Sequence, residues 1–171
     1  MPDRRSRRVA IAPAPASPVP AITAGGVAAP RIVDRGGDHV AVARSLVEYG
    51  RWLEWHDPDP ALVERAYAPA GVLARNMRAA VAEMRRTHEH IVEVDSEPLA
   101  FLVLSERANV VSFRLTEDLA HRERVDAAGH ALQHVGPSVE HYVVSITRFG
   151  PEAPWRLNLV ERERPPIEVQ L

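Results

Sequence analysis

The residues best suited to proton chemistry lie early in a long β-type run near the C-terminus. Glu140 and His141 stand side by side there, followed by Tyr142. Histidine titrates near neutral pH, and burial can raise the pKa of a carboxyl group, so either side chain could serve as a general base in a cavity. Adjacent strand residues point to opposite faces, so only one of the two can face inward. No catalytic residue is assigned, and Glu140 and His141 are kept as candidates.

Aromatic side chains are the candidates for lining an apolar pocket that would hold a small apolar ligand. The simpler interpretation is that they fill the core, because aromatic residues at helical spacing usually pack there. The pocket candidates are Tyr49, Trp52, Trp55, Tyr67 and Trp155.

Several histidines have a spacing that could suit a metal. His88 and His90 flank Glu89, but no third ligand is near them in sequence, and a cationic histidine also complements the end of a helix. His121 could approach His134 across a turn, in a region that also contains His130. A polar sheet surface explains these residues more simply, so no metal and no cofactor are assigned.

The half of the chain before Glu89 predicts three helices. Asp38 follows two glycines as an N-cap, and apolar residues then recur at helical spacing through Trp55. The segment His56-Asp-Pro-Asp-Pro60 ends this helix, because a residue that precedes proline disfavours the α conformation. A short second helix, with Asp59 as its N-cap, follows over 61–67, and a third helix covers about 72–87.

From Glu89 onward the apolar period changes to two, which predicts strands. The segment Asp126-Ala-Ala-Gly129 has the composition of a type I turn with glycine in the left-handed conformation. Helices followed by a meandering sheet predict an α+β fold with the helices on one face of an antiparallel sheet. The expected strands cover 90–94, 98–105, 110–116, about 121–125, about 131–135, 138–149 and 155–162.

Three N-terminal helices on a strongly bent antiparallel sheet resemble the cone-shaped superfamily of nuclear transport factor two, which includes ketosteroid isomerase and the SnoaL-like cyclases. The resemblance is carried by Tyr49–Pro60, Ala66-Tyr67 and the hairpin formed by Tyr142–Phe149 and Trp155–Glu161. It covers about residues 38–163. It implies a cone-like sheet, and its members include enzymes, binding modules and secretion accessory domains.

The chain departs from the enzymatic members of that superfamily after Tyr67. Those members follow the Tyr-Ala pair with acidic residues and a strand that carries a catalytic aspartate. Here Ala68–Arg75 contains no acid, and a helix continues. The resemblance is therefore closest to non-catalytic transfer or secretion accessory domains.

Composition and charge exclude several classes of protein. There is no cysteine, so disulfides and thiolate sites are absent, and all 21 basic residues are arginine. Residues 1–35 carry six arginines and two aspartates, a net +4, while residues 36–171 carry fifteen arginines and twenty-one acids, a net −6. A folded body of that charge argues against nucleic-acid binding. No stretch has the roughly 18 apolar residues of a transmembrane helix.

The N-terminal residues predict a disordered, basic tail rich in proline and alanine. They also have the layout of an export signal, with arginines at 4–8, an apolar segment over 9–23 and small residues over 24–29, although prolines interrupt the apolar segment. Export is expected if this segment acts as a signal, and a cytoplasmic location otherwise. The predicted organisation is a tail over 1–35, one domain over 36–164 and a C-terminal tail over 165–171.

The function predicted first is a non-catalytic interaction or assembly module, an accessory of a transfer or secretion system. It would form a homodimer, or bind a protein partner, through the open face of the sheet. The alternative is a small-molecule enzyme of the SnoaL or ketosteroid-isomerase type, with general acid/base catalysis in an apolar pocket. A third interpretation is a small-molecule-binding module without turnover.

Overall fold

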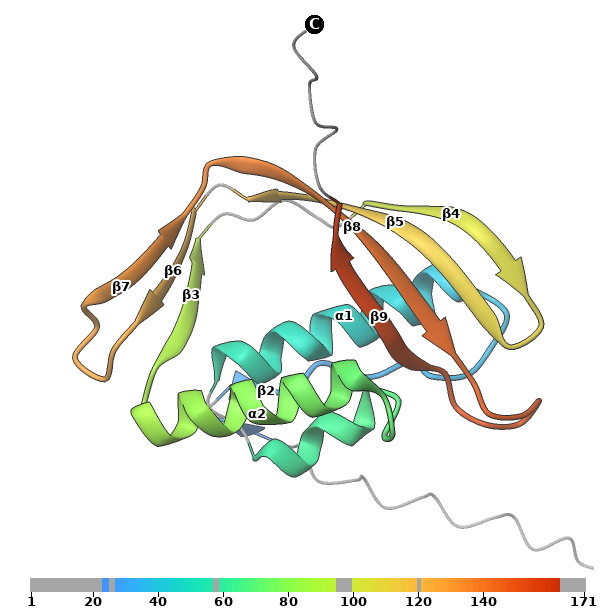
Figure 1. The fold of residues 1–171 in the computed structure, drawn as a ribbon, viewed down its shortest axis with the longest axis horizontal. Helices are drawn as coiled ribbons and strands as arrows, with labels where there is room; N and C mark the ends of the chain where they lie inside the picture. Colours follow the sequence, from blue (N-terminus) through green and yellow to red (C-terminus); the bar gives the residue numbers. More distant parts are fainter. Residues whose placement is uncertain (1–22, 25–26, 57–58, 95–99, 120, 164–171) are drawn as a thin grey trace, which may run out of the picture.

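The computed structural model describes residues 23–24, 27–56, 59–94, 100–119 and 121–163. In this part of the chain the fold is α+β, as predicted, with the helices on one side of two antiparallel sheets (Figure 1). Most of the predicted N-terminal tail, including the arginines and apolar residues of the export-signal layout up to residue 22, and the predicted C-terminal tail 165–171 lie outside the described residues. The helices are α1 (His39–Trp55), the 3-10 helix η1 (Pro60–Arg65) and α2 (Val72–Thr87).

The strands form a three-stranded sheet in the order β3-β6-β7 and a four-stranded sheet in the order β4-β5-β8-β9, with all pairs antiparallel. A two-residue pair, β1 (Thr23–Ala24) with β2 (Val27–Ala28), precedes the helices. The other strands are β3 (His90–Val94), β4 (Ala100–Arg107), β5 (Val110–Leu119), β6 (His121–Val125), β7 (Ala131–Val135), β8 (Ser138–Thr147) and β9 (Arg156–Arg162).

The structure has two sheets where the sequence predicted one bent sheet. Between β7 and β8 the chain passes through Gly136, at a φ of 108°, and Pro137. Proline has no amide hydrogen to donate to a ladder, so strand pairing stops there and resumes in the next sheet. Figure 1 shows the sheets as two sides of an arch above α1, and α1 contacts β3 on one side and β4, β8 and β9 on the other.

Two of the helix starts have the predicted caps. The Asp38 side chain accepts a hydrogen bond from the amide of Ala41, and the Asp59 side chain accepts one from Ala61. These bonds satisfy amide groups that have no partner within the helix. The third helix has the predicted bounds and is followed by its C-cap residue His88, whose φ of 57° is left-handed.

The second helix differs from its prediction. It is a 3-10 helix that ends at Arg65, whereas the sequence predicted a helix as far as Tyr67. Strand β9 accounts for the difference, because the amide of Leu157 donates to the carbonyl of Ala66 and the amide of Ala68 donates to the carbonyl of Leu157. Pairing with the sheet thus engages the carbonyl of Ala66 and the amide of Ala68, so that the helix does not continue, and it holds Tyr67 beside β9.

Residues before Gly36 also contact the folded body. Ala29 and Ile32 pack against the core, and the indole nitrogen of Trp52 donates to the carbonyl of Val27 at 3.3 Å. The Asp34 carboxylate pairs with Arg156 of β9 at 2.8 Å. The packed body therefore begins N-terminal to residue 36, where the sequence analysis placed the start of the domain.

The core lies between α1 and the inner face of the four-stranded sheet. On β5, Val111, Phe113 and Leu115 alternate toward the helices and are buried, and Glu117 continues the same alternation. A carboxylate thus occupies a core-facing position, which marks the polar end of the interior. Among the described residues, no helix is long and apolar enough to cross a membrane.

Candidate functional site

A cavity of about 310 Å³ lies among α1, α2 and the inner face of the sheet. This volume is at the lower end of the range for small-molecule pockets. Its walls are mostly apolar, and its polar groups gather where α1 faces β5 and β6. The lining residues are Val47, Gly50, Arg51, Glu54, Tyr67, Leu73, Met77, Leu115, Glu117, Arg122, Tyr142, Leu157 and Val160.

Helix α1 supplies the cavity with residues spaced along one face. Val47, Arg51 and Glu54 recur at intervals of four and three, the spacing that brings side chains onto a single helical face. The same face carries Gly50, which lets the Tyr67 ring approach the helix closely: a Cβ atom at Gly50 would lie 2.3 Å from the Tyr67 hydroxyl oxygen. Gly50 therefore makes room for the hydroxyl group at the cavity wall.

Glu117 of β5 holds two arginines at the polar end of the cavity. Its Oε1 atom accepts hydrogen bonds from Arg51 of α1 and from Arg122 of β6, the latter at 2.6 Å. The Glu117 side chain is 4% exposed, against 14% for Arg51 and 22% for Arg122. The cluster joins α1 to both sheets and places two guanidinium groups in the cavity wall.

Glu54 differs from Glu117 because no arginine is hydrogen-bonded to its carboxyl group among the described residues. Within the described part of the chain, no hydrogen bond or ion pair reaches the Glu54 carboxyl group. Burial raises the pKa of Glu54 above its ordinary value of 4.5, and the positive charges of Arg122 and Arg51 only partly oppose that rise. A partly buried carboxyl with a raised pKa in a cavity wall has the properties of a general acid or base.

Tyr67 is the second polar group of interest in the cavity. Its side chain is 3% exposed, and burial raises the pKa of the phenol strongly, with the charge of Glu54 adding to the rise. The hydroxyl group therefore keeps its proton at neutral pH and can donate a hydrogen bond to a bound ligand. Glu54 and Tyr67 together offer one group that exchanges a proton and one that holds an oxygen atom.

A second cavity, of about 350 Å³, lies on the far side of Glu54 and Arg122. These two side chains line both cavities and so stand between them. The second cavity is bounded by α2 and the inner face of the three-stranded sheet, and it is more highly charged. Its other lining residues are Ala80, Glu83, Met84, Glu89, Ile91, Arg124, Gln133 and Val135.

The structure separates the two candidate bases on β8. Glu140 is buried on the inner face, directly opposite Glu117 in the strand register, and its carboxylate is bound by Arg162. His141 is exposed, with its Nδ1 atom 3.1 Å from the hydroxyl oxygen of Thr116. Neither residue lines the cavity, whereas their neighbour Tyr142 does.

Of the five predicted pocket residues, Tyr67 lines the cavity and the other four do not. Tyr49 and Trp52 are buried in the core with their rings 5.5 Å apart. Trp155 is buried beneath the guanidinium group of Arg148, and Trp55 is half-buried beside Arg51. Most of these aromatics therefore have the core role that the sequence analysis treated as the simpler interpretation.

Four charged cavity residues were not predicted from the sequence: Arg51, Glu54, Glu117 and Arg122. A signal was present for Glu117, which continues the alternation of Phe113 and Leu115 toward the core. A signal was also present on α1, where Arg51 and Glu54 share a face with Val47. For Arg122 there was none, because its position depends on how β6 is placed beside α1.

We expect Gly50→Ala to destabilise the protein by about 1–3 kcal/mol, because the added methyl group would overlap the buried Tyr67 hydroxyl. In an open helix the same change would stabilise by about 1 kcal/mol, so steric conflict reverses the sign. Urea unfolding measures the effect. Gly37→Ala is the control, since a Cβ there meets nothing within 4 Å. A Gly50→Ala protein as stable as the wild type would contradict the close packing of Tyr67.

No known protein-family model matches this chain, and no curated protein sequence matches it either.

Proposed function

We propose that this protein is a small-molecule enzyme that uses general acid/base catalysis in the 310 Å³ cavity, with Glu54 as the base. The observation that carries the proposal is the carboxyl group of Glu54, which lines a mostly apolar cavity, has a raised pKa and forms no ion pair with any other described residue. This function is the alternative given by the sequence, with a different catalytic residue from the expected ones. It is favoured over a purely structural role because a structural carboxylate gains from the kind of pairing that Glu117 has.

The cavity suits a ligand that is mostly apolar and has one carbonyl oxygen. Leu73, Met77 and Leu157 would contact its hydrocarbon part, and the Tyr67 hydroxyl would donate a hydrogen bond to its oxygen. Glu54 in its ionised form would remove a proton from the carbon next to the carbonyl. The hydrogen bond from Tyr67 would stabilise the negative charge that develops on the oxygen atom.

The proposal includes the cone-shaped architecture of the nuclear transport factor two superfamily. Its support is the arch of two sheets over α1 (Figure 1). The cavity is lined by residues of the helices and of β5, β8 and β9. In this proposal the catalytic carboxylate comes from α1, which compensates for the absence of acids after Tyr67. The catalytic base would then lie on a helix, whereas the enzymatic members of the superfamily carry it on a strand.

Cyclohex-3-enone is a suitable probe, because it is small, apolar and carries one carbonyl group. Removal of a proton from C2 and its return to C4 would give the conjugated cyclohex-2-enone, with no other atom gained or lost, and ultraviolet absorbance follows the product. We expect catalysis by the wild-type protein and a loss of about 10²–10⁴-fold in the Glu54→Gln variant. Glu64→Gln is the control, because Glu64 is 59% exposed and paired with Arg78.

Binding of the probe is measured separately by the perturbation of nuclear magnetic resonance signals. Binding without isomerisation in the wild-type protein would exclude catalysis of this kind and favour a binding module. A Glu54→Gln variant as active as the wild type would refute the role given to Glu54. Retention of the wild-type thermal unfolding temperature in Glu64→Gln, and its retention or increase in Glu54→Gln, confirms that any lost activity is not lost folding.

A second candidate function is protein interaction, as the sequence analysis first predicted. The observation that favours it is on β4, an edge strand, where Leu102 is 60% exposed and Leu104 is 47% exposed. Exposed apolar side chains on a sheet edge are typical of surfaces that pair with another chain. Sedimentation of the wild-type protein and of a Leu102→Ser, Leu104→Ser variant tests this: self-association should be weakened by the changes, and a monomeric wild type would exclude the homodimer.

A further inference from the structure

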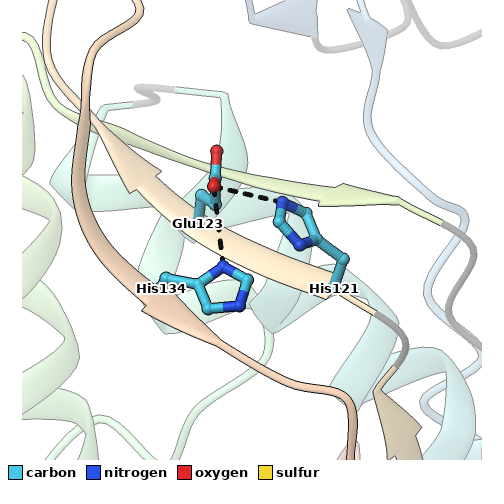
Figure 2. Close-up of side chains that lie close together, drawn as sticks. All are labelled: His121, Glu123 and His134. Atoms are coloured by element: carbon cyan, nitrogen blue, oxygen red, sulfur yellow. Dashed lines mark ion pairs between the residues drawn. The ribbon is translucent and has the colours of Figure 1, made fainter.

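Two histidines and a glutamate meet on the outer face of the three-stranded sheet. His121 and Glu123 alternate along β6, so both side chains point to the same face. His134 on β7 is directly opposite Glu123 in the strand register. Figure 2 shows both imidazole rings turned toward the Glu123 carboxylate. The strand pairing alone therefore brings three side chains with metal-binding atoms to one place.

The separations of these atoms are close to those of a metal site. His121 Nε2 lies 3.2 Å and His134 Nδ1 lies 3.5 Å from the same carboxylate oxygen, Oε1 of Glu123. Ligands about 2.05 Å from a tetrahedral zinc ion are about 3.3 Å from one another. Two of the three distances between ligand atoms are thus close to the required value. The third distance joins the two histidine nitrogens, and because all three ligand atoms lie within 4.8 Å of one another, small side-chain rotations would shorten it to that value.

Hydrogen bonding at His134 determines which of its nitrogens faces the carboxylate as a ligand. Nε2 of His134 lies 3.1 Å from the carbonyl oxygen of Gly136. A carbonyl oxygen only accepts hydrogen bonds, so Nε2 carries the hydrogen, and in the neutral ring Nδ1 presents a lone pair. That lone pair points at a carboxylate oxygen, which is also an electron-pair donor. A cation is needed between them, and a backbone carbonyl behind the ring is a common outer contact of metal-bound histidine.

We propose that His121, Glu123 and His134 form a binding site for a divalent transition metal, with Zn²⁺ as its ion. Imidazole and carboxylate are ligands that zinc accepts, and hard ions such as Mg²⁺ and Ca²⁺ prefer an all-oxygen set. Three protein ligands leave one tetrahedral position for water or another molecule. The side chains are 38%, 29% and 52% exposed in chain order, so the ion has access from solvent.

This metal site is separate from the proposed catalytic cavity. Arg122 lies between His121 and Glu123 in sequence and points to the opposite face, into the cavities beside Glu54. Zinc on the outer face would join β6 to β7 at residues 121, 123 and 134. The approach of His121 to His134 was predicted from the sequence, and the ring centroids lie 4.6 Å apart. The contribution of Glu123 follows only from the register.

The test is a zinc titration of the full chain, purified without a histidine tag, in competition with a chromogenic chelator. One ion per chain is expected to bind to the wild-type protein. His121→Gln, Glu123→Gln and His134→Gln are each expected to weaken binding by at least about tenfold. His130→Gln is the matched control, because His130 lies in the same hairpin but faces Asp126, and it is expected to bind zinc as the wild type does.

Imidazole nitrogen resonances give a second measurement that does not depend on affinity. Zinc is expected to shift Nε2 of His121 and Nδ1 of His134, and to leave the ring of His130 unchanged. Equal zinc affinity in the wild type and the three ligand variants would refute the site. So would resonances that respond to acid but not to zinc, because protons would then be the cations between the rings and the carboxylate.

Discussion

Replacing Glu117 by leucine is expected to lower the free energy of unfolding by about 3 kcal/mol or more, because it removes one member of a buried ionic cluster. Glu117 is 4% exposed and accepts hydrogen bonds from both Arg51 and Arg122. Its carboxylate is shared by two guanidinium groups, one from α1 and one from β6, and both are largely buried. Urea unfolding at neutral pH, with the midpoint and slope both fitted, measures the loss.

The control for this prediction is an ion pair at the surface. Glu64→Leu removes the partner of Arg78, but the Glu64 side chain is 59% exposed, so a change below about 1 kcal/mol is expected. Similar losses in Glu117→Leu and Glu64→Leu would contradict the special role of the buried cluster.

A further variant separates the charge effect from packing. Replacing all three members together, as Arg51→Met, Glu117→Leu and Arg122→Met, should recover part, but not all, of the stability lost by Glu117→Leu alone, since it also removes the positive charges beside Glu54. The recovery is expected because an apolar set of similar volume needs no compensating charge. The three changes act within one cluster, so their effects will not add. A triple variant less stable than Glu117→Leu would show that the arginines stabilise the fold through other contacts.

Most of the fold could be predicted from local patterns. The helix Val72–Thr87 follows from its apolar spacing, and the turn at Asp126–Gly129 follows from its composition: the structure has Gly129 at a φ of 84° and its amide bonded to Asp126. Such features depend on near neighbours. The end of the second helix at Arg65 could not be predicted in this way, because it depends on backbone bonds from Ala66 and Ala68 to Leu157, which is distant in sequence.

The candidate site was harder to predict because its residues come from separate elements. Glu54 and Glu117 are ordinary acids in sequence, and only the placement of α1 beside the sheet makes one a cavity carboxyl and the other the centre of an ionic cluster. His141 attracted attention because histidine titrates near neutrality, but the strand register leaves it exposed beside Thr116. Residue type thus indicated which groups could react, and tertiary structure decided which of them face a cavity.

The Glu54→Gln variant is expected to be more stable than the wild type at neutral pH and equally stable in acid. The pKa of Glu54 is raised above 4.5 in the folded protein, chiefly by burial, so the folded state holds the proton more tightly than the unfolded chain. Below about pH 4 both states are protonated and glutamine imitates the acid. As the pH rises from 4.5 to the raised pKa, the unfolded chain loses its proton first, and wild-type stability falls relative to the variant.

The size of this difference follows from the pKa shift, at about 1.4 kcal/mol for each unit by which the pKa is raised. Above the raised pKa the difference is constant. The charged groups that face Glu54 enter the measurement equally in both proteins, because they are retained; they are Arg51, Glu83, Glu89, Glu117, Arg122 and Arg124. Urea unfolding of both proteins between pH 4 and pH 8 gives the difference directly.

Glu83→Gln provides a control of opposite sign. A hydrogen bond from Arg86 lowers the pKa of Glu83, so its stabilising effect is present above pH 4.5 and is lost as the pH falls through the lowered value. This variant should therefore be less stable than the wild type at neutral pH, where Glu54→Gln is more stable. A Glu54→Gln protein that gains no stability at neutral pH would show that the carboxylate is well solvated. A gain in stability together with lost isomerase activity would instead identify Glu54 as a group retained for function at the expense of the fold.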